Sequence, residues 1–253
     1  MKLPFIKMHA LGNDYVYIDC LSRKMDSHMA NADLPALARK LSDRHRGIGS
    51  DGLVLILPSR VADVRMRMFN ADGSEAEMCG NAARCIAKYV YEQGFCGNPL
   101  TLETLAGIKH LSMQINPEGK VELVTVNMGT TLGNPHEVFF VDTADALDAQ
   151  FGLLSADARY ADLRKRANIE CAYVINKNEL RMRVCERGAG ETMACGTGAC
   201  AAAVAAMERG LTSSTVTVHM PGGDLIVSRD DSGVIYLTGT ATEVFRGEIS
   251  ITH

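Results

Sequence analysis

The chain has 253 residues, of which 47% are hydrophobic and 22% are charged. This balance is typical of a globular protein and excludes a largely disordered chain or a fibrous repeat. The net charge of -4 and the lack of a basic run with interleaved aromatic residues argue against a nucleic-acid partner. No apolar stretch is long enough for a signal peptide or a membrane span, so we expect a cytoplasmic protein without a membrane partner that acts on a small molecule.

Strands outnumber helices in the predicted order of elements. Alternating or β-branched runs predict strands at 15–19, 53–57, 64–69, 121–127, 138–141, 172–175, 180–185, 215–220 and 234–238. The first predicted helix, at 34–43, has an apolar stripe and begins after Asp33, a suitable cap for its first amides.

Two later helices are short and rich in alanine. They are predicted at 82–93 and 199–209, and each is followed by a glycine, Gly94 or Gly210. Glycine suits the left-handed backbone that commonly ends a helix. Because alanine lets neighbouring strands approach closely, we expect each helix to be a core element wrapped by strands.

An internal repeat organises the chain. The tripeptide RMR occurs at 65–67 and again at 181–183, which is 116 residues later. The same offset aligns Glu75 with Glu191, Cys79 with Cys195, Gly80 with Gly196, Ala83 with Ala199, Glu92 with Glu208, Gly94 with Gly210 and Gly107 with Gly223. We interpret the two segments as related halves of one chain.

The eight cysteines do not predict a disulfide framework or a metal site. The chain is long and rich in apolar residues, and it contains no Cys-x2-Cys pair, so reduced thiols and no metal are expected. Free cysteines are usually buried small hydrophobes. That structural interpretation applies to Cys20, Cys85, Cys96, Cys171, Cys185 and Cys200.

Cys79 and Cys195 differ from the other cysteines because they share the repeat register and stand where a helix begins. The first amides of a helix have no intrahelical partner and attract an anion such as a carboxylate. The same field is expected to lower a thiol pKa from about 8.5 and to favour the thiolate.

Two such thiols suggest stereochemical inversion. If the two helix starts face each other, a substrate carboxylate is held by both sets of amides, with its α-carbon between the sulfurs. One thiolate then removes the α-proton while the other thiol delivers a proton to the opposite face. Amide dipoles in a site closed to water would stabilise the anionic intermediate, so no cofactor is expected.

Four segments of the chain resemble the diaminopimelate epimerase family. They are HALGNDY at 9–15, NADGSEAEMCGNAARC at 70–85, GNPH at 133–136 and ERGAGETMACGTGAC at 186–200. The motifs are long and specific, and the resemblance covers nearly the whole chain. It implies conversion of LL-2,6-diaminopimelate to the meso form, an amino-acid diacid substrate, and a homodimer.

The resemblance also implies an α+β fold of two pseudo-symmetric domains. Each domain is expected to be a mixed sheet or roll wrapped around a central helix, with the active site in the cleft between the domains. The expected boundaries are 1–128, rejoined by about 243–253, and 129–242.

Site residues follow from the same motifs. Cys79 and Cys195 are the implied catalytic pair, with His136 assisting Cys79 and Glu186 assisting Cys195. The implied substrate-binding residues are Asn13, Asn70, Gly80, Asn81, Asn134, Asn168, Glu186, Arg187, Gly196 and Thr197. Arg187 has the side chain best suited to grip a second carboxylate.

Structural interpretations of these residues stay open at this point. A lone histidine such as His136 is more often structural, single asparagines often form turns, and Glu186 could simply pair with Arg187. Two features also depart from the family pattern. Gly52 stands where some members have glutamine, and VNMG at 126–129 leads almost directly into GNPH, where the family usually has additional strands.

Two other functions compete with this prediction. The first is the same chemistry on another amino acid, such as histidine or lanthionine. A proline-type racemase is disfavoured, because such enzymes carry Met-Cys-Gly-His at the first site and Asn81 follows Gly80 here. The second is a non-enzymatic thiol redox or binding protein, which the lack of a Cys-x2-Cys pair disfavours.

Overall fold

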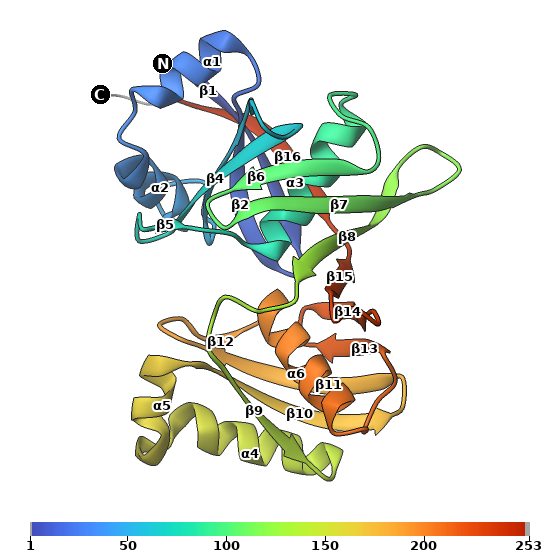
Figure 1. The fold of residues 1–253 in the computed structure, drawn as a ribbon. Coiled ribbons are helices and arrows are strands. Elements are labelled where there is room, and N and C mark those ends of the chain that lie inside the picture. The colour runs from blue at the N-terminus through green and yellow to red at the C-terminus, as the bar shows by residue number, and fades with distance from the viewer. Residues whose placement is uncertain (1, 251–253) are drawn as a thin grey trace. The chain divides into compact units, whose positions relative to one another are not determined.

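The computed structural model describes residues 2–250, apart from the side chains of residues 23 and 24. It divides into two compact units (Figure 1). Unit 1 comprises residues 2–126 and 240–250, and unit 2 comprises residues 127–239. From the sequence we expected the breaks at 128/129 and near 243. Within the described residues, no helix is long and apolar enough to cross a membrane.

Unit 1 is a curved mixed sheet with three helices. Its elements are β1 (Lys2–Ala10), β2 (Asn13–Asp19), α1 (Arg23–Ala30), α2 (Leu34–Ser42), β3 (Gly52–Leu57), β4 (Val64–Asn70), β5 (Glu75–Ala76), α3 (Gly80–Glu92), β6 (Leu100–Thr104), β7 (Gly107–Ile115), β8 (Val121–Gly129), whose last residues pass into unit 2, and β16 (Thr242–Ser250). The strand order is β16-β1-β2-β3-β4-β6-β7-β8. The pairs β2–β3 and β4–β6 are parallel, and the other neighbours in this order are antiparallel.

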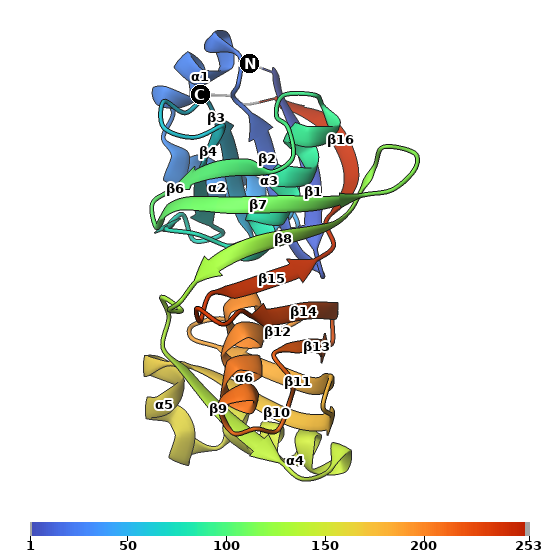
Figure 2. The same cartoon turned by 45° about the vertical axis from the view of Figure 1, so that its right-hand side comes forward.

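The two faces of strand β2 lead to two different layers of unit 1. Val16 and Ile18 belong to a buried cluster shared with α2. The alternate residues, Tyr15 and Tyr17, point to the other face, where Tyr15 approaches Cys79 at the start of α3. Helix α3 packs against β1 and β7, and Figure 2 shows it enclosed by the strands of this unit.

Unit 2 repeats this plan with different outer helices. Its elements are β9 (His136–Val141), α4 (Ala144–Ala156), a short 3-10 turn (Ala158–Tyr160), α5 (Ala161–Arg166), β10 (Asn168–Asn176), β11 (Glu179–Glu186), β12 (Gly190–Thr192), α6 (Gly196–Glu208), β13 (Thr215–Met220), β14 (Gly223–Arg229) and β15 (Ile235–Gly239). The strand order is β15-β14-β13-β11-β10-β9. Helix α4 packs on β9, β10 and β11 around Phe151. Helix α6 contacts every strand in that order.

The repeat is present in the structure at the expected register. Helix α3 spans Gly80–Glu92 and helix α6 spans Gly196–Glu208, so both ends are displaced by 116 residues. Each helix is followed by a glycine with a positive φ angle, 75° at Gly94 and 66° at Gly210. The two α+β units are therefore two copies of one arrangement, in which an alanine-rich helix is wrapped by a mixed sheet.

Several elements differ from the sequence prediction. Helices α3 and α6 begin at Gly80 and Gly196, two or three residues earlier than predicted, because the preceding cysteine itself occupies the cap position. Helix α2 ends at Ser42, and Asp33 caps it as expected by accepting a hydrogen bond from the amide of Ala36. The elements that the sequence prediction omitted are β1, β5, β6, β7, β12, β14, β16, α1, α4 and α5.

Candidate active site

Both central helices begin at a cysteine with extended backbone. The φ and ψ angles are -136° and 122° at Cys79, and -125° and 112° at Cys195. In each case the cysteine carbonyl accepts the first intrahelical hydrogen bond, from Ala83 or Ala199. The side chain of a cap residue lies beside the free first amides of its helix. Both sulfurs are therefore held at a helix N-terminus.

The loop before each cysteine is tied down by a repeated ion pair. In unit 1, Arg67 of β4 binds Glu75 of β5 through two hydrogen bonds of 2.7 and 3.2 Å. In unit 2, Arg183 of β11 binds Glu191 of β12 through two bonds of 2.8 and 2.9 Å. A bidentate guanidinium–carboxylate pair fixes orientation as well as distance. The RMR motif thus has a structural role, which is to secure the hairpin that leads into the cysteine.

The side chains that contact the sulfur of Cys79 are neutral. Its thiol lies 3.7 Å from the Oδ1 atom of Asn13, and the hydroxyl of Tyr15 lies 4.0 Å from the sulfur. The Nδ2 group of Asn81 also donates to Oδ1 of Asn13, at 3.1 Å. Behind Asn81, the fully buried Arg84 donates to its Oδ1 atom at 2.7 Å. The Asn81 side chain is thus held by two protein partners, while its backbone amide belongs to the helix start.

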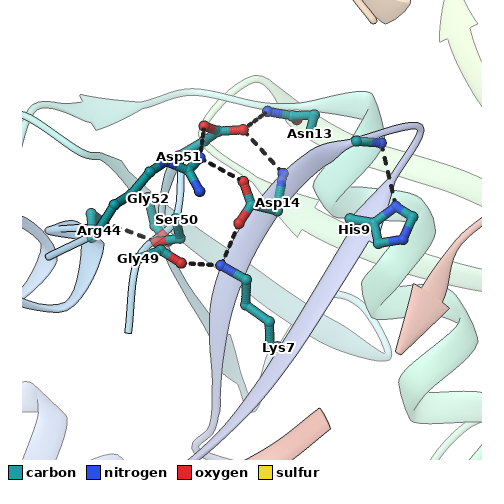
Figure 3. Close-up of polar contacts among 11 residues, drawn as sticks. Lys7, His9, Asn13, Asp14, Arg44, Gly49, Ser50, Asp51 and Gly52 are labelled. Carbon is teal, nitrogen blue, oxygen red and sulfur yellow. Dashed lines mark hydrogen bonds and ion pairs between the residues drawn. The ribbon is translucent and has the colours of Figure 1, made fainter. Parts of the chain in front are cut away.

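A cluster of charged groups fixes the orientation of Asn13 (Figure 3). Its Nδ2 group donates to Asp51 at 2.8 Å, which leaves Oδ1 to face Cys79. Arg44 bridges Asp51 and Asp14, at 2.9 Å to each carboxylate. The buried Lys7 contacts Asp14 and the carbonyl of Gly49. An amide that donates to a carboxylate cannot flip without losing that bond, so these ion pairs hold the polar side of Asn13 against the thiol.

Acidic side chains lie near the sulfur of Cys195. The amide of Gly198 donates to the sulfur at 3.4 Å, and the hydroxyl of Thr197 lies 3.5 Å from it. Two acidic residues, Glu186 and Glu170, lie close enough for their charges to act on this thiol. Glu186 accepts a hydrogen bond of 2.6 Å from Thr192. It forms no ion pair with Arg187 among the described residues, so the structural interpretation of Glu186 as the partner of Arg187 is not supported.

Burial governs the acidity of both thiols. It raises the pKa of the Cys79 thiol, although the backbone amides of Ala82 and Asn81 act in the opposite direction. Burial also raises the pKa of the Cys195 thiol well above its ordinary value, and the charge of Glu186 adds to this rise. The expectation that the helix starts lower both pKa values is therefore wrong for this structure, because loss of hydration outweighs the amide hydrogen bonds.

The histidine of GNPH is paired with a residue that the sequence analysis missed. His136 begins β9, and its Nδ1 atom lies 2.8 Å from Oε1 of Glu170 in β10. The exposed fractions of the two side chains are 5% and 0%. A single glutamate between Ile169 and Cys171, in a run of buried residues, was the available signal. A buried carboxylate almost always has a partner.

The other expected binding residues belong to different units. Asn13, Asn70, Gly80 and Asn81 lie in unit 1 with Cys79, whereas Asn134, His136, Asn168, Glu186, Arg187, Gly196 and Thr197 lie in unit 2 with Cys195. Asn168 is buried and accepts a hydrogen bond of 2.9 Å from the amide of Arg187. Arg187 and Asn134 are exposed, and Asn70 donates to Ser74.

Two further observations bear on the chemistry of the site. All eight cysteines are free thiols, and no group of three or more potential ligands suited to a metal ion occurs among the described residues. At Gly52, a Cβ atom would collide with the carbonyl of Phe69. The backbone at this position therefore admits glycine and not the glutamine that some family members carry.

Comparison with known proteins places the chain in one family. The family model for diaminopimelate epimerase matches residues 5–132 and again residues 130–244. A diaminopimelate epimerase of Pelotomaculum thermopropionicum is 44% identical, over 97% of this chain and 98% of the relative. A diaminopimelate epimerase of Acetivibrio thermocellus is 42% identical, over 98% and 99%. These alignments span 281 and 286 positions, so the relatives carry residues that this chain of 253 residues lacks.

A solved structure shares the fold at low sequence identity. A phenazine biosynthesis protein of the PhzF family from Bacillus anthracis has a TM-score of 0.72 and 19% identity, with 99% of this chain and 100% of that chain covered. At this identity the likeness concerns the fold alone.

Proposed function

Since the chain belongs to the diaminopimelate epimerase family, we propose that it interconverts LL- and meso-2,6-diaminopimelate by proton transfer at the α-carbon through Cys79 and Cys195. The observation that carries this proposal is the repeated helix start, which gives each unit one thiol at the N-terminus of its central helix. Every close relative described above is named for the same activity.

The proposed reaction needs one thiolate and one thiol on opposite faces of the substrate. The thiolate takes the α-proton and becomes a thiol, while the opposing thiol gives its proton to the carbanion and becomes a thiolate. The two sulfurs exchange roles with each turnover, so the reverse reaction uses the same groups. The proposal requires the two units to bring both sulfurs to one α-carbon.

Helix-start amides supply the proposed binding of the reacting carboxylate. Gly80 and Asn81 in unit 1, and Gly196 and Thr197 in unit 2, lie in the first turn of their helices. Their amides lack intrahelical acceptors and favour negative charge. The charge that develops on the carboxylate during proton abstraction is stabilised by the same groups. This is where the reaction obtains the stabilisation that an amino-acid carbanion needs.

Neighbouring polar groups have proposed roles in proton transfer. Glu186 assists Cys195, whose pKa its charge raises, and His136 assists Cys79. Arg187 is exposed and makes no ion pair among the described residues, so it is free to bind the distal carboxylate of a diacid. Asn168, which accepts from the backbone of Arg187, holds that segment in place. Asn13, Asn70 and Asn134 are proposed to bind the amino and carboxylate groups of the substrate.

The experiment that tests this function compares substrates directly. Reduced enzyme is incubated separately with LL-diaminopimelate, meso-diaminopimelate, L-histidine and L-lanthionine, and the stereoisomers are separated by chiral chromatography. We expect interconversion of the two diaminopimelate isomers and a rate at least about tenfold lower with the other amino acids. Faster inversion of histidine or lanthionine would assign the chain to a different substrate.

Two controls accompany the substrate comparison. Pretreatment with hydroxylamine followed by dialysis, which removes pyridoxal-type cofactors, is expected to leave the rate unchanged. Mild oxidation is expected to abolish the activity, and added thiol is expected to restore it. Full activity after both cysteines are shown to be oxidised contradicts the proposed mechanism.

A further inference from the structure

The pair formed by Glu170 and His136 is built into the sheet of unit 2. Strands β9 and β10 are parallel neighbours in which His136 lies opposite Asn168 and Val138 lies opposite Glu170. Glu170 is therefore two positions along β10 from the residue opposite His136. Residues two positions apart on a strand share one face of the sheet, which is why the carboxylate and the ring meet at 2.8 Å.

The carboxylate of Glu170 also packs against the start of α6. A Cβ atom on Gly198 would lie 2.7 Å from Oε1 of Glu170 and 3.4 Å from the sulfur of Cys195. The carboxylate and the sulfur thus both lie beside the same glycine, whose amide donates to that sulfur. The charged and titratable groups that face Glu170 are His136, Glu186 and Cys195.

Part of this pair has no partner in the protein. Among the described residues, Nε2 of His136 and Oε2 of Glu170 are buried without a hydrogen bond. A buried ion pair contributes little net stability, because desolvation of the two groups cancels most of the attraction. A carboxylate with no exposed surface, held against one nitrogen of a ring whose other nitrogen is unpaired, is instead typical of a histidine that is oriented for proton transfer.

We propose that Glu170 is a positioning residue that sets the tautomer of His136. Its carboxylate accepts the proton on Nδ1, so the neutral ring carries its hydrogen there and keeps a lone pair on Nε2. In the reaction, Nε2 takes the proton of the Cys79 thiol to give a thiolate and an imidazolium, and it returns that proton when the thiolate is to be restored to a thiol. The negative charge of Glu170 stabilises the imidazolium. The catalytic part of this inference rests on the proposed function, whereas the tautomer does not.

The tautomer can be read without any assay of activity. Protein labelled with 15N-histidine gives separate nitrogen signals for the two ring atoms, and a His136→Gln variant identifies which of the seven histidines is His136. In spectra recorded at about pH 8, we expect hydrogen on Nδ1 in the wild-type protein. In Glu170→Met, which has a similar size but no carboxylate, we expect hydrogen mainly on Nε2. A wild-type ring with hydrogen on Nε2, or an unchanged tautomer in the variant, overturns the proposal.

Kinetics then test the role of the pair in the reaction. Both Glu170→Met and Glu170→Gln should lower kcat for diaminopimelate by about 10²-fold while KM stays within about threefold. The matched control is Glu208→Gln at the far end of α6, which loses a surface pair with Arg229 and should change neither the tautomer nor kcat. Unchanged kcat in both Glu170 variants contradicts the catalytic role. If wild-type enzyme does not invert diaminopimelate, the proposed function fails while the nitrogen signals still decide the tautomer.

Discussion

The two cysteine sites have the same backbone arrangement and differ in the charged groups around the sulfur. In both units the thiol caps an alanine-rich helix behind a hairpin held by an arginine–glutamate pair. The Cys79 sulfur is contacted by Asn13 and Tyr15, which are neutral, and the charge of the buried Arg84 acts to lower its pKa. Cys195 lies near the carboxylates of Glu186 and Glu170. The repeat thus preserves the backbone at each cysteine, while the side chains set different environments for the two sulfurs.

This difference bears on how the resting enzyme carries its protons. Burial raises the pKa of both thiols, and the negative charge beside Cys195 raises the pKa of that thiol further. A thiolate at Cys195 is therefore disfavoured more strongly than one at Cys79. In the proposed mechanism, Glu186 and His136 accept the proton that burial retains on the sulfurs, so the reaction can run in both directions.

Removal of either thiol should have the largest effect. Cys79→Ala and Cys195→Ala should each lower epimerisation in both directions by at least about 10³-fold, because every inversion needs one thiolate and one thiol. Rates are measured by chiral chromatography, with Cys96→Ala as a control outside both helices. Substantial epimerisation by one of the two variants would show that the two sites are not equivalent partners in catalysis.

Substitution of a polar residue beside each thiol should reduce the electrostatic difference between the two cysteine sites. Asn13→Asp places a carboxylate beside Cys79, and Glu186→Gln removes one beside Cys195. Each change should lower kcat/KM by about 10²-fold. Alkylation by iodoacetamide, followed by mass spectrometry, should become slower at Cys79 in the first variant and faster at Cys195 in the second, since a nearby carboxylate raises a thiol pKa. Alkylation rates that do not move would mean that these side chains do not control the thiols.

Loss of the contact proposed for the distal carboxylate of the substrate should have a smaller effect, because it changes only Arg187 in unit 2. Arg187→Ala should weaken binding of the diacid by about 10- to 100-fold through loss of a charge-assisted hydrogen bond. A monocarboxylate amino acid tested as a competitive inhibitor should bind the variant and the wild type equally. Equal losses for both ligands would remove Arg187 from recognition of the second carboxylate.

The helix ends should respond alike in the two units. Gly94 and Gly210 both have positive φ angles and open space around the position of a Cβ atom. Alanine at either position should therefore lower the free energy of unfolding by about 1 kcal/mol through backbone strain alone. Urea denaturation followed by circular dichroism measures the change. A much larger loss at one position would show that the repeat is not structurally equivalent there.

The features that the sequence predicted best are those that depend on a local pattern of residues. The cysteine positions, the alanine-rich helices and the repeat offset all follow from residues close together in the chain, and the helix bounds of 80–92 and 196–208 keep that offset. The pairing of His136 with Glu170 joins residues 34 apart and depends on the register of two parallel strands. No local pattern specifies that register, so the role of Glu170 was not predicted.

The predicted direction of the two thiol pKa shifts was wrong for a related reason. A helix start visible in the sequence predicts favourable amides, but it does not show how completely the surrounding strands bury the sulfur. The structure supplies that burial, and the desolvation of a thiolate outweighs its amide hydrogen bonds at both Cys79 and Cys195. Strands β7 and β16 were missed because many of their residues are exposed, which weakens the apolar signal.

Isotope labelling in heavy water tests the two-thiol account most directly. When one stereoisomer is mixed with enzyme in D2O, the thiolate removes the substrate's own hydrogen while the opposing thiol already carries deuterium. We predict that early product carries deuterium at the inverted α-carbon while unreacted substrate stays largely protiated, and that the reverse reaction shows the mirror pattern. Early product that retains hydrogen, or label that enters substrate and product together, would indicate a single base and would contradict the assignment of Cys79 and Cys195 as an acid–base pair.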